Sequence, residues 1–433
     1  MAFIKQSMYT LITRGIQVIS AFIVTIVVAQ TLGTLGTGTY ELFQLLVTFS
    51  VTLGAFGIGH ASVYLIKKEK ADMRETLSTV FTVGLVWGII LGGLVYIFYT
   101  VFPSLVAGLP PSAILIGAAL IPCALIESYL IQALLIEFYM QKQALLVGFK
   151  NGCLLVCLVL ALLIFDAGTT GVIYSVVIAY ILSSLMTTTA IWRLYRLRLQ
   201  FSRAVFNRLL SFGVRSWLAN IFLILNFRLD MFLVNHFADI HAVGSYSVAV
   251  TVAGGLFLLP SAIGPLLYSR WSAMPPKKIA AETPQLSRQI LLLSTILALI
   301  LAAYGRTILS IVYGNSFIDA FPALVILLPG IVMTSINYVL FNSLAALGKP
   351  GLNAISLIVG LVINIALNIV LIPYGGIVGA ALASTVSYTL TTLITIAFVL
   401  RYHPGHASRN FIFPTLSDTL ILAKRLKQLV SHS

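Results

Sequence analysis

The chain has 433 residues, of which 59% are hydrophobic and 9% are charged, against roughly 45–50% and about 25% in ordinary soluble domains. This composition excludes a soluble globular protein and indicates an integral membrane protein. The net charge is +14, but no connector between the apolar runs is long enough to form the basic face of a nucleic-acid-binding domain. We therefore expect no nucleic acid partner.

Apolar runs close to the roughly 20 residues that a helix needs to cross the bilayer recur along the whole chain. The alternating pattern typical of barrel strands does not appear. We predict an all-α polytopic protein with about twelve transmembrane helices. In chain order the predicted spans are 9–31, 39–66, 76–101, 113–138, 146–166, 170–194, 210–237, 242–268, 289–312, 321–346, 352–373 and 377–400.

The connectors between these spans alternate in charge. Basic connectors lie at 67–75, 141–150, 193–208, 269–289 and 348–351, and the C-terminal tail is also basic, whereas the connectors between them contain no Lys or Arg. All but four of the 26 Lys and Arg residues thus fall on one side. Because positive charge marks the cytoplasmic side, an even number of spans predicts that both termini are cytoplasmic.

Two segments of the chain resemble each other. Residues 38–68 begin with Gly-Thr-Tyr and residues 244–272 begin with Gly-Ser-Tyr, and each continues as a long span before a basic connector. We predict that helix-bending residues interrupt both copies: Gly57 and Gly59 in the first, Pro260 and Pro265 in the second. A parallel repeat of six spans follows, with an N-terminal lobe at 1–200, a C-terminal lobe at 201–402 and a basic tail at 403–433. Paired bundles with interrupted helices are typical of alternating-access transporters.

Residues 417–430 of the tail combine apolar positions with a basic side made by Lys424, Arg425 and Lys427. They predict either an amphipathic helix in the membrane interface or a frayed terminus.

Charged residues inside the predicted spans are candidates for function, because a charge at the centre of a membrane helix costs at least about 2.5–3.5 kcal/mol. Arg228 lies about 18 helical residues, or about 27 Å, from the basic end of its span. It is too deep to reach the interface, whereas Arg14 and Arg215 lie near the boundary and can snorkel. We take Arg228, Arg215 and Arg14 as candidates for a cationic substrate-binding cavity.

The acidic candidates are Asp230 and Glu127, with Asn226 sharing the Asp230 side of its helix at i−4. Asp230 and Arg228 are two residues apart and point in nearly opposite directions, so they do not form a simple local ion pair. We interpret Asp230, Glu127 and Asn226 as ion-coupling candidates. The alternative is an interhelical network, of Arg228 with Glu127 or of the Arg228–Asp230 type, that only fixes packing.

Several kinds of site are not indicated. No phosphate-binding loop occurs, so we expect no ATP site. His60, His236 and His241 lack metal-ligand spacing, so we expect no cofactor and no metal, although coupling to H⁺ or Na⁺ is compatible with the acidic candidates. No connector is large enough for a catalytic domain, and we expect that the protein is not an enzyme.

The C-terminal half carries recognisable motifs: "NFRLDMFLVNHF" from residue 226, "YGNSF" at 313–317, Leu-Gly-Lys-Pro at 347–350 and "NIALNIVLIPYGG" at 364–376. Together they resemble polysaccharide-type flippases of the multidrug/oligosaccharidyl-lipid/polysaccharide exporter superfamily. The resemblance covers most of the chain and is strongest from 205 to 400.

The resemblance implies a fold of two six-helix lobes, like that of multidrug and toxic compound extrusion (MATE) transporters, in a bacterial or archaeal cytoplasmic membrane. It implies transport of a lipid-linked oligosaccharide, typically on an undecaprenyl pyrophosphate carrier, from the cytoplasmic to the outer leaflet. The implied partners are that substrate, membrane lipids, and a glycan polymerase with other assembly proteins. The lipid II flippase branch usually has two further spans, which this sequence lacks.

Three other functions remain open at this point. A small-molecule antiporter of the same superfamily would favour an acidic cavity, whereas basic residues outnumber mid-span acids here. A membrane glycan polymerase or ligase would need a larger outer connector. A lipid scramblase without ion coupling is equally compatible with the sequence.

Overall fold

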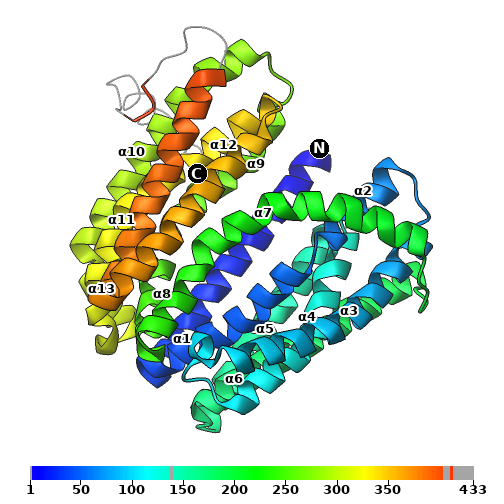
Figure 1. Ribbon diagram of the computed structural model, residues 1–433, viewed down its shortest axis with the longest axis horizontal. Coiled ribbons are helices and arrows are strands. Elements are labelled where there is room, and N and C mark those ends of the chain that lie inside the picture. The colour runs from blue at the N-terminus through cyan, green and yellow to red at the C-terminus, as the bar shows by residue number, and fades with distance from the viewer. Residues whose placement is uncertain (1, 137–139, 403–409, 413–433) are drawn as a thin grey trace. The chain divides into compact units, whose positions relative to one another are not determined.

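The computed structural model describes residues 2–136, 140–402 and 410–412 and is almost entirely helical over these residues (Figure 1). The main helices are α1 (Ala2–Gly54), α2 (Ile58–Lys68), α3 (Met73–Val101), α4 (Pro111–Ala133), α5 (Met140–Val159), α6 (Gly168–Tyr195), α7 (Arg203–Phe237), α8 (Ile240–Gly254), α9 (Leu258–Trp271), α10 (Pro276–Ile308), α11 (Phe321–Ser335), α12 (Asn337–Ala346) and α13 (Pro350–Tyr402). Short 3₁₀ or π turns occupy Pro103–Val106, Leu160–Ile164, Gly255–Phe257, Leu309–Tyr313 and Asn315–Ala320.

The predicted twelve-span architecture is confirmed, although the helices do not match the spans one to one. α1 and α13 each contain two spans that reverse at a single glycine: Gly33 (φ 61°, ψ −152°) and Gly376 (φ 52°, ψ −131°). Both have positive φ, a conformation that glycine adopts at little cost. Conversely, three predicted spans are each formed by two consecutive helices. For example, α8 and α9 form one span and meet at Gly255–Phe257.

The described chain divides into two compact units. The first comprises Met1–Ile224, Met231–Ser247 and Val312–Ser316, and the second comprises Leu225–Asp230, Val248–Ile311 and Phe317–Ser433. α7 thus contributes to both units. The predicted lobes at 1–200 and 201–402 stay a prediction.

Within the first unit, α3 packs on α4, α1 packs on α5, and α6 contacts both α4 and α5. Figure 1 shows α3, α4, α5 and α6 as a bundle of neighbouring helices. Within the second unit, α11 packs on α13 and α10, and α9 packs on α12. Buried apolar side chains from these helices form most of the cores of both units.

Only a small part of the predicted tail is described. The backbone carbonyl of Asn410 accepts a hydrogen bond from the guanidinium of Arg288 at 2.6 Å, and Phe411 is buried. Residues 403–409 and the predicted interfacial helix at 417–430 lie outside the described residues.

Candidate functional site

The polar segment of α7 presents different side chains to different surroundings. Arg228 is exposed, whereas Asn226 and Asp230 are buried, Asp230 being 2% exposed. The i, i+4 spacing places Asn226 and Asp230 on one side of the helix. One turn of α7 therefore carries an accessible cation and a buried acid.

The carboxylate of Asp230 lies against α13. Ser384 Oγ donates to Asp230 Oδ2 at 3.3 Å. Asn364 Nδ2 lies 3.4 Å from Ser384 Oγ and 3.1 Å from Ser387 Oγ, and Asn368 Nδ2 donates to Asn364 Oδ1 at 2.9 Å. Asn364 and Asn368 precede the reversal at Gly376, and the two serines follow it. The two arms of α13 thus meet in a buried polar network beside α7.

Two amide oxygens of this network are buried without a hydrogen-bond partner in the described structure, those of Asn226 and Asn368. The Asn226 amide nitrogen is satisfied, because it donates to the carbonyl of Leu357 at 2.9 Å. A buried polar atom without a partner is costly and calls for an explanation such as a bound ion or water. Carboxylate, amide and hydroxyl oxygens are the ligands that hard cations prefer.

The first unit contains a different charge cluster. Lys150 Nζ of α5 lies 3.4 Å from Glu127 Oε2 of α4, and Ser183 of α6 donates to Glu127 Oε1 at 2.7 Å. The ammonium also lies 3.4 Å from the centroid of the Tyr180 ring. The Lys150 side chain is 25% exposed and that of Glu127 is 8% exposed. Glu127 is therefore held by an ammonium and a hydroxyl inside the helix bundle.

This cluster corrects the assignment of Lys150 to a connector. Lys150 is the eleventh residue of α5, with apolar residues on both sides along the helix. A fifth basic residue thus lies within a span, besides Arg14, Arg215, Arg228 and Arg306. The ion pair that the structure gives Glu127 is with Lys150, and a packing network that involves Arg228 stays a prediction.

The second span is broken between α1 and α2, and aromatic side chains from three helices satisfy its freed carbonyls. Trp217 of α7 donates to Thr52 at 2.8 Å, Trp87 of α3 donates to Gly54 at 2.8 Å, and Tyr129 of α4 donates to Ala55 at 3.0 Å. Irregular backbone at membrane depth is stable where neighbouring helices supply such partners. Side chains of three other helices in the first unit therefore stabilise the break between α1 and α2.

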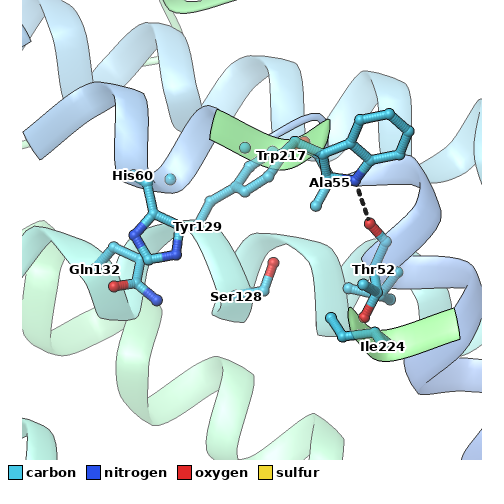
Figure 2. Close-up of a pocket in the computed structure, with 11 residues that line it drawn as sticks. Thr52, Ala55, His60, Ser128, Tyr129, Gln132, Trp217 and Ile224 are labelled. Carbon is cyan, nitrogen blue, oxygen red and sulfur yellow. Dashed lines mark hydrogen bonds between the residues drawn. The ribbon is translucent and has the colours of Figure 1, made fainter. Parts of the chain in front are cut away.

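A pocket of about 180 Å³ lies at this break. Figure 2 shows Trp217 bonded to Thr52 at one end of it, with His60 and Gln132 at the other. Gly57 has φ 66°, and a Cβ there would lie 2.3 Å from the carbonyl oxygen of Gly213 on α7. The predicted bending residues Gly57 and Gly59 line this pocket.

Four further predicted residues lie on α1, α7 and α9. Arg215 is exposed on α7, thirteen residues before Arg228. Arg14 belongs to α1, but its side chain lies outside the described part. Pro260 is buried in α9. Pro265 also belongs to α9, and its side chain is likewise not among those described.

The family described as "Polysaccharide biosynthesis protein" matches residues 27–322. A relative from Haloferax volcanii named "Probable low-salt glycan biosynthesis flippase Agl15" is 29% identical over 170 residues, which are 38% of this chain and 36% of the relative. The curated relatives are matched over 36–47% of their own length.

Solved structures match over most of the chain. The lipid II flippase MurJ in an inward closed conformation superposes with a TM-score of 0.78 at 15% identity, covering 97% of this chain and 90% of MurJ. An inward-facing MATE multidrug transporter superposes with a TM-score of 0.66 at 16% identity, covering 89% and 94%. At these identities the likeness shows the fold, and that fold is the one expected from the sequence.

Proposed function

Because this chain belongs to the polysaccharide biosynthesis protein family, we propose that it is a flippase that moves a lipid-linked oligosaccharide across the membrane by alternating access. The substrate class is an oligosaccharide on a polyprenyl pyrophosphate carrier, moved from the cytoplasmic to the outer leaflet with both termini cytoplasmic. The proposal includes no enzymatic step, no ATP site and no cofactor. Its partners are the lipid-linked substrate, surrounding lipids and the polymerase that consumes the product.

Arg228 is the observation that carries the proposal. The residue is exposed in the structure, and the sequence places it about 18 helical residues from the basic end of its predicted span. A guanidinium exposed to lipid tails at that depth is costly, so intramembrane arginines face water or protein. Arginine is also the side chain best suited to a pyrophosphate, because its planar fork donates two parallel hydrogen bonds to phosphate oxygens. Arg228 therefore fits an aqueous site for the carrier headgroup.

Lys150 supports the same function from the first unit. Its ammonium is paired with Glu127 yet remains partly exposed. An approaching phosphate can compete with Glu127 for this ammonium, because both are oxygen anions. Lys150 was missing from the predicted cavity residues, and the proposal now includes it as a separate phosphate contact of the first unit.

In this proposal, the coupling ion binds at residues of the second unit. The network around Asp230 combines one carboxylate with hydroxyls and with the two partnerless amide oxygens of Asn226 and Asn368. One carboxylate with hydroxyl and amide oxygens beside it suits a monovalent cation or a proton better than a divalent metal, which favours several carboxylates. We assign H⁺ or Na⁺ coupling to Asp230, with Asn226 and Asn368 as auxiliary ligands.

The test is transport by the purified protein in liposomes loaded with a fluorescent lipid-linked oligosaccharide. Glycan that reaches the outer leaflet is measured with an impermeant glycosidase. We expect transport by the wild type, at least a tenfold loss in Arg228→Glu, and partial activity in Arg228→Lys. The matched control is Arg306→Glu, an equal charge change at an exposed residue of α10.

Full activity of Arg228→Glu would remove the proposed headgroup site while leaving the family assignment intact. If no lipid-linked glycan moved but a small organic cation were expelled, the small-molecule antiporter would replace the flippase. Equal transport with and without any ion gradient would favour an uncoupled scramblase.

A further inference from the structure

A second groove lies on the first unit, away from the residues considered above. It has a volume of about 390 Å³, within the roughly 300–1,000 Å³ that is typical of ligand sites. The turn after α4, the beginning of α5 and the end of α6 form it. Its lining residues are Leu134, Lys142, Leu145, Leu146, Met186, Ala190, Arg193 and Leu194.

The groove has an apolar floor and apolar walls. Leu134 is 1% exposed and Leu146 is also buried, and both belong to the core cluster at this end of the unit. Leu145, by contrast, is 68% exposed, and Met186 on the opposite wall is exposed as well. Such a surface fits a hydrocarbon chain, which gains contacts with the floor that are absent on a flat helix surface.

Two basic residues accompany the apolar lining. Lys142 lies in the first turn of α5 and Arg193 in the last turn of α6. Both are exposed. They come from different helices but line one groove, so an anion placed there would be attracted by both cations.

The depth of the groove matches the headgroup region of a bilayer. Trp192, next to Arg193, is exposed and packs edge-to-face on Phe81 with ring centroids 5.6 Å apart, and tryptophan is enriched at membrane interfaces. Arg74, in the first turn of α3 and next to a basic connector, donates to the carbonyl of Arg196 at 2.9 Å. The end of α6 therefore lies at the side that carries the basic connectors.

We propose that this groove is a binding site for an anionic phospholipid of the surrounding leaflet. The phosphate lies between Lys142 and Arg193, and one acyl chain runs along Leu145 and Met186 over the Leu134 floor. Basic pockets between transmembrane helices on the cytoplasmic side bind anionic headgroups in this way. The lipid contacts both the beginning of α5 and the end of α6, and this arrangement exists only in the folded protein. Its binding therefore stabilises the folded first unit by mass action.

The experiment measures lipid retention and thermal unfolding of the purified full-length protein with dioleoyl phosphatidylglycerol or dioleoyl phosphatidylcholine. Retained lipid is counted by native mass spectrometry, and the apparent affinity comes from titration of the melting temperature. The charge variant is Lys142→Gln with Arg193→Gln, and the groove-filling variant is Ala190→Phe. The matched control is Arg203→Gln, which removes an exposed charge outside the groove lining.

We expect the wild type to retain phosphatidylglycerol over phosphatidylcholine. Each lost charge should weaken phosphatidylglycerol binding about fivefold, the equivalent of about 1 kcal/mol per basic residue, and Arg203→Gln should bind as the wild type does. Ala190→Phe should reduce the retention of both lipids.

Equal retention of the two lipids by the wild type would overturn the proposal, as would a charge variant that binds like Arg203→Gln. Unchanged retention by Ala190→Phe would overturn the placement of the acyl chain in this groove.

Discussion

The two units each bury a carboxylate, but they surround it differently. In the first unit Glu127 is held by the Lys150 ammonium and the Ser183 hydroxyl. In the second unit Asp230 accepts a hydrogen bond from Ser384 of α13, and the amide oxygens of Asn226 and Asn368 in the same network have no hydrogen-bond partner among the described residues. The carboxylate of the first unit thus has a tethered ammonium, and that of the second unit belongs to a network of hydroxyl and amide groups.

This difference suggests a division of roles. A buried carboxylate that already has an ammonium gains little from an external cation, because the site is close to neutral. The Asp230 network adds hydroxyl and amide oxygens beside its carboxylate, and these can act as further ligands for a mobile cation or proton. We therefore expect the sensitivity to ions to reside in the second unit and the Glu127–Lys150 pair to act chiefly in structure and headgroup contact.

The largest expected effect is that of Asp230→Asn on ion dependence. Removing one partner of a buried charge pair costs about 3–5 kcal/mol, so the variant should need more than about a hundredfold higher cation concentration for the same transport rate. Glu127→Gln is the matched control and should keep the wild-type ion dependence. Transport measured against Na⁺ and pH gradients distinguishes them, and the opposite pattern would reverse the roles of the two units.

Loss of Lys150 should destabilise the protein, because it leaves Glu127 buried without its cation. We expect Lys150→Met to lower the free energy of unfolding by roughly 2–3 kcal/mol, less than the about 3–5 kcal/mol of a fully buried pair since the ammonium is partly exposed. The double variant Lys150→Met with Glu127→Gln should recover most of this loss. Denaturation in mild detergent measures both, and an absence of recovery would show that the pair is not the source of the loss.

A smaller effect is expected at the helix break of the first unit. Trp217→Phe retains the aromatic ring but removes the donor to Thr52, so it should lower the free energy of unfolding by about 1 kcal/mol. Trp192→Phe is a matched control, because the structure gives the Trp192 indole no hydrogen bond to a helix break. Equal melting temperatures for the two variants would contradict a stabilising role for the Trp217 hydrogen bond.

Hydropathy and turn residues predicted most of the fold, because both act locally. The apolar runs defined twelve spans, and the glycines near 33 and 376 fell in predicted connectors. What the sequence could not show is how tight those reversals are: single glycines with positive φ join spans that were expected to be separated by short loops.

The site was less predictable, since its residues become distinctive only through contacts between helices. Lys150 was assigned to a connector because other basic residues precede it, yet its ammonium meets Glu127 across two helices. Asn364, Asn368, Ser384 and Ser387 are ordinary polar residues in an apolar sequence. Their pattern around Asp230 depends on the reversal of α13, which brings residues twenty positions apart into contact. Arg228 and Asp230 were identifiable because charge in an apolar run is itself a signal.

The most direct test of the proposed headgroup site is whether water reaches residue 228 in the bilayer. In a variant with Cys123, Cys153 and Cys157 replaced by alanine, a cysteine is introduced by Arg228→Cys or, as a control, by Val362→Cys, which is 61% exposed on α13 in an apolar setting. Labelling in liposomes with a hydrophilic, charged maleimide should modify residue 228 and spare residue 362. Protection of residue 228 to the same extent as residue 362 would place Arg228 against lipid or dry protein and contradict the proposed aqueous site.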